Sequence, residues 1–176
     1  MLQRMFTKYI NLQIDRVKTC PQSGMLGENV FRKFEAVLKH LVSLITKSTE
    51  TKIIAQIMSD NPFAGIPELL ADDDKKKALD TARSLIQDGT LIIPELLIET
   101  LNTQLGNVTD SFLEMLSRMF DDDNRNAVCN ALTDGKIYHV IDDITIDDGD
   151  THNNGRCVMI LHTDAGRLVY KPHDMR

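Results

Sequence analysis

The spacing of apolar residues along this chain changes from helical to strand-like near residue 133. Before that point apolar residues recur at steps of three and four, the period of an amphipathic helix. One such segment covers residues 1–17, and a long one begins at Asn29 and continues through 51–59. Residues 19–24 separate the two, because they contain a proline and a glycine. The pattern therefore predicts two helices joined by a short turn.

Three further helices are predicted before residue 133. The acidic run 72–74 opens the first of them, because negative charge favours a helix N-terminus, and Gly89 ends it. The next is predicted to end at Gly106. The third is predicted to begin at Ser111, where Ser-x-x-Glu is a capping-box pattern, and to run toward residues 131–132.

Residues 133–176 have the composition of strands and turns. The run 156–162 is apolar on both faces and rich in β-branched residues, which predicts a strand covered on both sides. Thr163–Gly166 then supplies a hairpin turn, with Gly166 free to take a positive φ, and 167–171 returns as the second strand. The fold class is therefore α+β, with a mainly α-helical part over 1–132 followed by a β-hairpin.

The hairpin also gives Lys171 a predicted position. With a loop of three or four residues, Lys171 lies opposite Met159 or Val158, at the end of the hairpin away from the turn. Pro172 cannot donate a ladder hydrogen bond, so the return strand should end before it.

Composition narrows the class of protein. The 176 residues are 42% hydrophobic and carry 20 basic against 26 acidic side chains, a net charge of -6. An acidic chain without a basic face argues against a nucleic-acid partner. No apolar run has the length of a membrane span, and the three cysteines form no disulfide or zinc pattern. A soluble, cytoplasmic protein is expected.

Asp150 and His152 are the first candidates for chemistry. In an extended segment residues two apart project to the same side, so these two side chains face one space. A carboxylate beside an imidazole fixes its tautomer and raises its basicity, which suits proton transfer near neutral pH. Without further context, a structural hydrogen-bonded pair is the more common explanation of such a pattern.

A metal site is not predicted. The paired aspartates of 142–143 and 147–148 have no regular ligand spacing and are better interpreted as hydrated loop residues. His152, His162 and His173 are too far apart for the His-x-x-x-His pair of a helical zinc site.

The wider sequence around Asp150 supplies the context. The string Gly149-Asp-Thr-His-x-x-Gly-Arg-x-Val158, followed by a strand, a turn and Leu168-Val-Tyr-Lys-Pro172, resembles the dehydratase domain of class II lanthipeptide synthetases, the LanM-type enzymes. The resemblance is specific over residues 149–172 and loose over the helices. It implies that 1–132 is the helical lead-in region of the dehydratase domain. Residues 133–176 are then its strand-rich segment, which resembles the start of a lipid-kinase-like dehydratase domain and is incomplete.

What the resemblance implies for function follows residue by residue. Such enzymes use ATP and magnesium to phosphorylate Ser or Thr of a ribosomally made precursor peptide, and then eliminate the phosphate. Lys171 matches the lysine that serves phosphorylation at the ATP phosphates, and Asp150 and His152 match the pair that serves elimination. His173 stands where the family usually has Arg.

The same resemblance implies further residues beyond Lys171. The magnesium ligands and the other kinase residues of the family come after the lysine, so the chain is expected to be the N-terminal, truncated part of the domain. On this hypothesis the chain alone is inactive, and its partners are the precursor peptide and the downstream part of the synthetase.

Two other hypotheses remain open. The chain could be a non-catalytic helical module that binds the precursor peptide or a partner subunit. It could also be a small-molecule kinase, which would account for Lys171 but leave Asp150 and His152 without a role.

Overall fold

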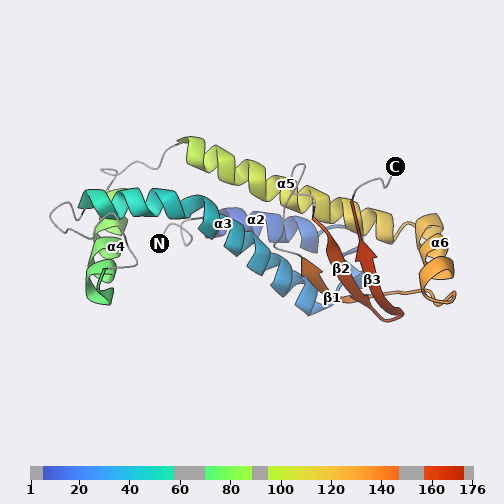
Figure 1. The fold of residues 1–176 in the computed structure, drawn as a ribbon. Helices are drawn as coiled ribbons and strands as arrows, with labels where there is room; N and C mark the ends of the chain where they lie inside the picture. The colour runs from blue at the N-terminus through green and yellow to red at the C-terminus, as the bar shows by residue number, and fades with distance from the viewer. Residues whose placement is uncertain (1–5, 58–69, 89–94, 147–156, 173–176) are drawn as a thin grey trace. The chain divides into compact units, whose positions relative to one another are not determined.

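A computed structural model of the chain describes residues 6–57, 70–88, 95–146 and 157–172. In these four stretches, six helical elements are followed by three strands (Figure 1). In chain order they are α2 (Thr7–Lys18), η1 (Ser23–Met25), α3 (Glu28–Ile57), α4 (Asp72–Gln87), α5 (Glu95–Met119), α6 (Asp122–Leu132), β1 (Ile141–Ile146), β2 (Met159–Thr163) and β3 (Gly166–Tyr170). The predicted α+β class, helices first and strands last, is confirmed.

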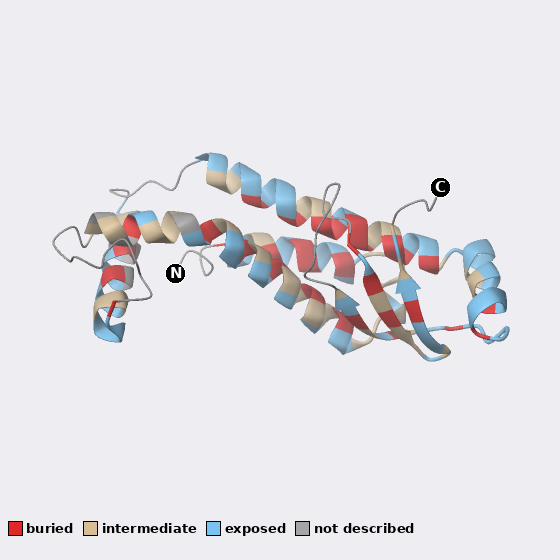
Figure 2. Ribbon diagram, in the orientation of Figure 1, coloured by how far each residue is buried: buried red, intermediate tan, exposed pale blue. Residues whose placement is uncertain are grey.

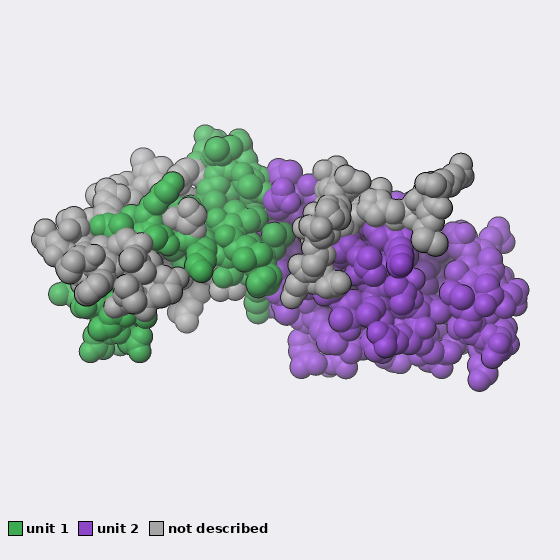
Figure 3. Space-filling view, viewed as in Figure 1, with its two compact units in different colours: residues 1–8, 39–102 green, residues 9–38, 103–176 purple. Residues whose placement is uncertain are grey.

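The chain divides into two units (Figure 3). Unit 1 consists of residues 1–8 and 39–102, and unit 2 of residues 9–38 and 103–176. The sheet and the start of α3 belong to unit 2, whereas α4 belongs to unit 1.

In unit 2 the helices contribute apolar stripes to one core. Phe34 of α3 and Phe112 of α5 stack with their ring centroids 4.5 Å apart and their planes 22° apart, and both rings are fully buried. Such a stack adds to the burial of the rings themselves. Buried residues also follow one side of α2 and of α3 (Figure 2), as the predicted stripes require: Ile10, Ile14, Val17, Val30 and Leu38.

The helix α5 corrects the sequence prediction. A helix was expected to end at Gly106 and another to begin at Ser111, but one helix runs through both positions. The apolar residues keep their helical spacing across the expected break, with Leu105, Val108 and Phe112 buried. Glycine inside a helix costs about 1 kcal/mol, and burying several large side chains gives more than that.

The break in this region comes later, at Asp121. Its carboxylate accepts a hydrogen bond of 3.0 Å from the backbone N–H of Asn124 and so caps α6. At the other end of α6, Asp134 and Gly135 take positive φ of 51° and 76°, and the Gly135 N–H donates to the carbonyl of Cys129. The predicted handover at 133–135 is therefore a left-handed helix end.

In unit 1, α4 begins at Asp72, as the acidic run predicts. Ala78 and Ala82 are buried on its inner side. The expected helix end at Gly89 lies outside the described residues.

The three strands form an antiparallel sheet in the order β1-β2-β3. A bulge in β1 between Ile141 and Asp143 lets both Ile141 and Ile144 face the buried side, although an odd number of positions separates them. On the side of β1 away from β2, the backbone N–H of Gly27 donates to the carbonyl of Ile141 at 2.9 Å. The segment before α3 thus pairs with the start of this edge strand.

The prediction that β2 is covered on both faces is wrong. Met159 and Leu161 are buried, but Ile160 between them is only partly covered and Val158 is 38% exposed. The helices of unit 2 bury one face of the sheet, and the β-branched residues of the other face fit a pleated surface without being covered.

Among the described helices, none combines the length and the apolar content needed to cross a bilayer.

Candidate functional site

The candidate site is built on the hairpin of β2 and β3. Thr163 pairs with Gly166 across a two-residue turn, and Gly166 has φ of 136°, a value that glycine adopts without strain. The Thr163 hydroxyl donates to the carbonyl of Gly166 at 2.8 Å and accepts from the N–H of Ala165 at 3.2 Å. The loop is shorter than the three or four residues expected from the sequence.

The turn is anchored to the segment that precedes β1. The carboxylate of Asp164 accepts hydrogen bonds from the backbone N–H groups of His139 and Val140, at 2.8 and 3.3 Å. Burial alone would raise the pKa of Asp164, but these hydrogen bonds to its charged form outweigh that effect and lower the pKa. The hairpin is therefore fixed at its closed end, and its register is set.

The register of the hairpin determines the position of Lys171. Met159 pairs with Tyr170, so the next position along the hairpin sets Lys171 opposite Val158, one of the two positions predicted. Lys171 follows the last residue of β3 and is exposed. It makes no ion pair or hydrogen bond with the part of the chain that the structure describes, so its ammonium group is available to an anion.

Asp150 and His152 lie outside the described residues. The chain is described again from Cys157, which is buried next to the start of β2. The proximity of Asp150 and His152 to each other and to Lys171 stays a prediction.

A charged cluster that the sequence did not reveal lies across β1 and β2. The Nζ atom of Lys33, from α3, is 2.7 Å from a carboxylate oxygen of Asp143. His162 pairs with Asp143 across the strands. The pKa of Asp143 is lowered mainly by the hydrogen bond from Lys33, with burial opposing and the Ile144 N–H and the charges of Lys33 and His162 adding to the effect.

The contacts of Asp143 indicate a structural role. Its carboxylate joins α3 to the sheet and also accepts from the backbone N–H of Ile144, so it is a structural residue. Within the four described stretches, no three His, Cys, Asp or Glu side chains group closely enough to hold a metal ion. The contact between Lys33 and Asp143 spans 110 positions, and no local sequence pattern signals it.

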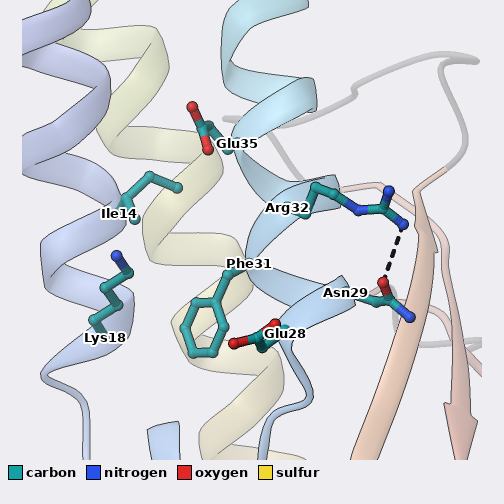
Figure 4. A pocket seen from close by; sticks show the side chains of 7 residues that line it. All are labelled: Ile14, Lys18, Glu28, Asn29, Phe31, Arg32 and Glu35. Carbon is teal, nitrogen blue, oxygen red and sulfur yellow. Dashed lines mark hydrogen bonds between the residues drawn. The ribbon is translucent and has the colours of Figure 1, made fainter.

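Unit 2 also contains a pocket of about 520 Å³ between the end of α2 and the first turns of α3 (Figure 4). Figure 4 shows the Phe31 ring between Lys18 and Glu28, and Arg32 turned away to donate to Asn29 at 3.0 Å. Two carboxylates, Glu28 and Glu35, line the pocket together with the two cations. They oppose the charge of a nucleotide triphosphate, so this pocket is a poor candidate for the ATP site.

The hairpin, β1 and the two helices before the sheet lie in a region that matches a family model. Residues 95–176 match the family described as a domain of unknown function (DUF4135). The matched region begins at the first residue of α5 and includes α6, the three strands and Lys171. It does not include α2, α3 or α4. No curated protein matches the chain.

Proposed function

We propose that the chain is the N-terminal part of the dehydratase domain of a class II lanthipeptide synthetase, with 1–132 as its helical lead-in region and 133–176 as the strand-rich segment that carries the motifs. The observation that carries the proposal is the Gly-Asp-Thr-His string together with the Tyr-Lys-Pro hairpin. The match of residues 95–176 to the domain of unknown function supports it, because that domain is found in lanthipeptide synthetases. The exposed Lys171 without a partner among the described residues is compatible with a role at phosphate.

The proposed first step is phosphoryl transfer from ATP to a Ser or Thr hydroxyl of the precursor peptide. The hydroxyl oxygen bonds to the terminal phosphorus of ATP, ADP leaves, and the hydroxyl proton is lost. Lys171 neutralises the negative charge on the phosphate oxygens, which stabilises the transition state. The family also uses magnesium, and among the residues that the structure describes no three His, Cys, Asp or Glu side chains lie close enough together to hold a metal ion.

The proposed second step is elimination. A base removes the Cα proton, the electron pair forms the Cα=Cβ bond, and the C–O bond to phosphate breaks, which yields dehydroalanine from Ser or dehydrobutyrine from Thr. Asp150 and His152 serve this step as an acid/base pair, either by protonating the departing phosphate or by orienting the base.

The two steps can be separated by mass spectrometry of the peptide. The chain is joined to the downstream part of a synthetase and incubated with ATP, magnesium and a Ser/Thr-rich precursor. A phosphorylated peptide is heavier and a dehydrated peptide is lighter than the starting material. We expect neither product from the chain alone and the dehydrated product from the joined protein.

Substitutions then assign the residues. Lys171→Met is expected to lower the rate of phosphorylation by about 10²-fold or more, whereas Lys136→Met, at another exposed lysine, leaves it unchanged. Asp150→Asn and His152→Asn are expected to leave phosphorylation intact and to accumulate phosphopeptide, because elimination slows by about 10²–10⁴-fold. Full dehydration by the Lys171→Met protein would contradict the proposal.

A second candidate is a non-catalytic module that binds the precursor peptide or a partner subunit. A partner-binding helix would use exposed apolar side chains, and in unit 1 Leu44 of α3 is 59% exposed and Leu96 of α5 is 72% exposed. On this hypothesis the chain binds the peptide without changing its mass, and Leu44→Glu weakens the binding.

A further inference from the structure

The outer edge of β3 differs from the other edge of the sheet. At the β1 edge, Gly27 donates a backbone hydrogen bond to the first residue, Ile141, whereas β3 has a strand on one side only within the described part of the chain. A strand of this kind presents unpaired backbone N–H and C=O groups.

The register shows which residues present those groups. In a hairpin with a two-residue turn the closing pair, here Thr163 and Gly166, is hydrogen-bonded, and the pairs then alternate. Arg167 and Val169 fall at the alternate positions, so their N–H and C=O groups point away from β2 toward the open edge.

Along this edge, two cationic side chains lie on either side of one apolar side chain. Arg167, Val169 and Lys171 project from the same face, because successive residues of a strand alternate. Val169 is 53% exposed, and both cations are exposed and make no ion pair with any described residue. The edge therefore combines backbone hydrogen-bonding groups with an apolar side chain between two positive charges.

We infer that β3 binds an extended acidic peptide, which adds to the sheet as a further strand. Acidic side chains of the peptide face Arg167 and Lys171, and an apolar side chain between them packs on Val169. The backbone hydrogen bonds provide affinity, and the alternating side chains provide specificity. This inference goes beyond the proposed function: Arg167 and Val169 have no role in the proposed chemistry. Lys171 is the one residue that the two share, so the tests below change Arg167 and Val169 and leave Lys171 in place.

A second copy of the chain fits this edge less well. Two β3 strands paired antiparallel about Val169 would set Arg167 of one copy opposite Lys171 of the other. Like charges directly opposite each other in a sheet destabilise the pairing. The same two positive charges attract an acidic partner at this edge, although the chain as a whole carries a net charge of -6.

Binding is tested with a fluorescently labelled peptide of the pattern Glu-x-Val-x-Glu and fluorescence anisotropy. We expect saturable binding by the full chain, and at least about tenfold weaker binding of the Lys-x-Val-x-Lys peptide, since charge complementarity of this kind is worth about 1.4 kcal/mol or more. Arg167→Glu is expected to weaken binding of the acidic peptide about fivefold to tenfold. Lys52→Glu makes the same change of charge on α3 in unit 1 and should have no effect.

The strand geometry is tested separately. Val169→Pro removes an outward N–H without removing a hydrogen bond to β2, and should abolish binding. If that variant fails to fold, as judged by circular dichroism, peptides methylated on alternate backbone nitrogens give the same information with the unchanged protein. Methylation on the edge that faces β3 should abolish binding, and methylation on the other edge should not.

The inference is overturned by any of three results: no saturable binding of the acidic peptide, equal binding of the Arg167→Glu protein, or equal binding of both methylated peptides. Self-association of the chain that Val169→Pro removes would also overturn it, in favour of a second copy as the occupant.

Discussion

The contact between Lys33 and Asp143 gives the sheet a pH-dependent attachment to α3. In the unfolded chain Asp143 has an ordinary pKa of about 3.9, and in the folded chain the pKa is lower. The folded state therefore favours the charged form, so this stabilisation is fully present above about pH 3.9 and is lost as the pH falls through the folded pKa.

Replacing Asp143 should remove that contribution. We expect Asp143→Asn to lower the free energy of unfolding at pH 7 by less than about 1 kcal/mol, because both partners are partly exposed. The difference from the unsubstituted protein should shrink in urea unfolding at pH 3. Asp142→Asn changes an exposed neighbour and serves as the control. A difference that persists unchanged at pH 3 would contradict this account.

The pKa of Tyr138 shifts in the opposite direction from that of Asp143. Its hydroxyl donates to the carbonyl of Met119, the last residue of α5, and burial raises its pKa to about 12, with Cys129 adding to the increase and Arg125 opposing it. The folded state favours the neutral phenol, so the stabilisation is complete below about pH 10 and is lost as the pH rises toward 12.

We expect Tyr138→Phe to cost about 1 kcal/mol at pH 7, because a carbonyl at a helix end loses its donor. Between pH 10 and 12 the unsubstituted protein should lose stability faster than the variant, by up to about 1.4 kcal/mol for each pH unit. Chemical unfolding across that range measures both effects. Parallel pH profiles for the two proteins would show that Tyr138 does not titrate as described.

At the scale of elements, the segment before α3 depends on close backbone approach. A Cβ atom on Gly27 would lie 2.8 Å from the carbonyl oxygen of Asp142, closer than such atoms approach one another. We expect Gly27→Ala to lower the free energy of unfolding by about 1–3 kcal/mol, because the contact between this segment and β1 must open. Gly24→Ala is a matched control, since a Cβ at Gly24 meets nothing within 4 Å. Thermal unfolding monitored by circular dichroism compares the two variants, and equal midpoints would refute the explanation.

Some elements, but not all, could be predicted from the local sequence. The start of α3 and the hairpin turn at Gly166 follow from residues within a few positions of each other, and both were predicted. The length of α5 was not, because Gly106 and the Ser111 pattern are local signals that packing against Phe34 overrides. The bulge in β1 has no local signal, because it depends on which residues the rest of unit 2 buries.

The same distinction applies to the candidate site. The register of Lys171 follows from the hairpin, so one of the two predicted positions was right. The link from Lys33 to Asp143 joins residues far apart in sequence, and only the folded chain shows it. The convergence of Asp150, His152 and Lys171 rests on the resemblance, and the substitutions proposed above are its test.

At the scale of the whole molecule, α3 and α5 each contribute residues to both units. The chain has three tyrosines and no tryptophan, and Tyr9, Tyr138 and Tyr170 all belong to unit 2. Tyrosine fluorescence therefore reports on unit 2, whereas far-ultraviolet circular dichroism also reports on α4 of unit 1. Because the two units share helices, we expect both signals to change in one cooperative transition.

The stacked ring pair offers a way to test that cooperativity. Phe112→Ala removes a fully buried ring and its contact with Phe34, which should cost about 3–5 kcal/mol. We expect the fluorescence and circular dichroism transitions to move together to a lower denaturant concentration. The reason is that α3 and α5, which lose their packing in unit 2, continue into unit 1. Leu12→Ala, at an exposed position of α2, should leave both transitions in place. A circular dichroism phase that keeps its midpoint while the tyrosine signal shifts would mean that unit 1 folds independently of the aromatic core.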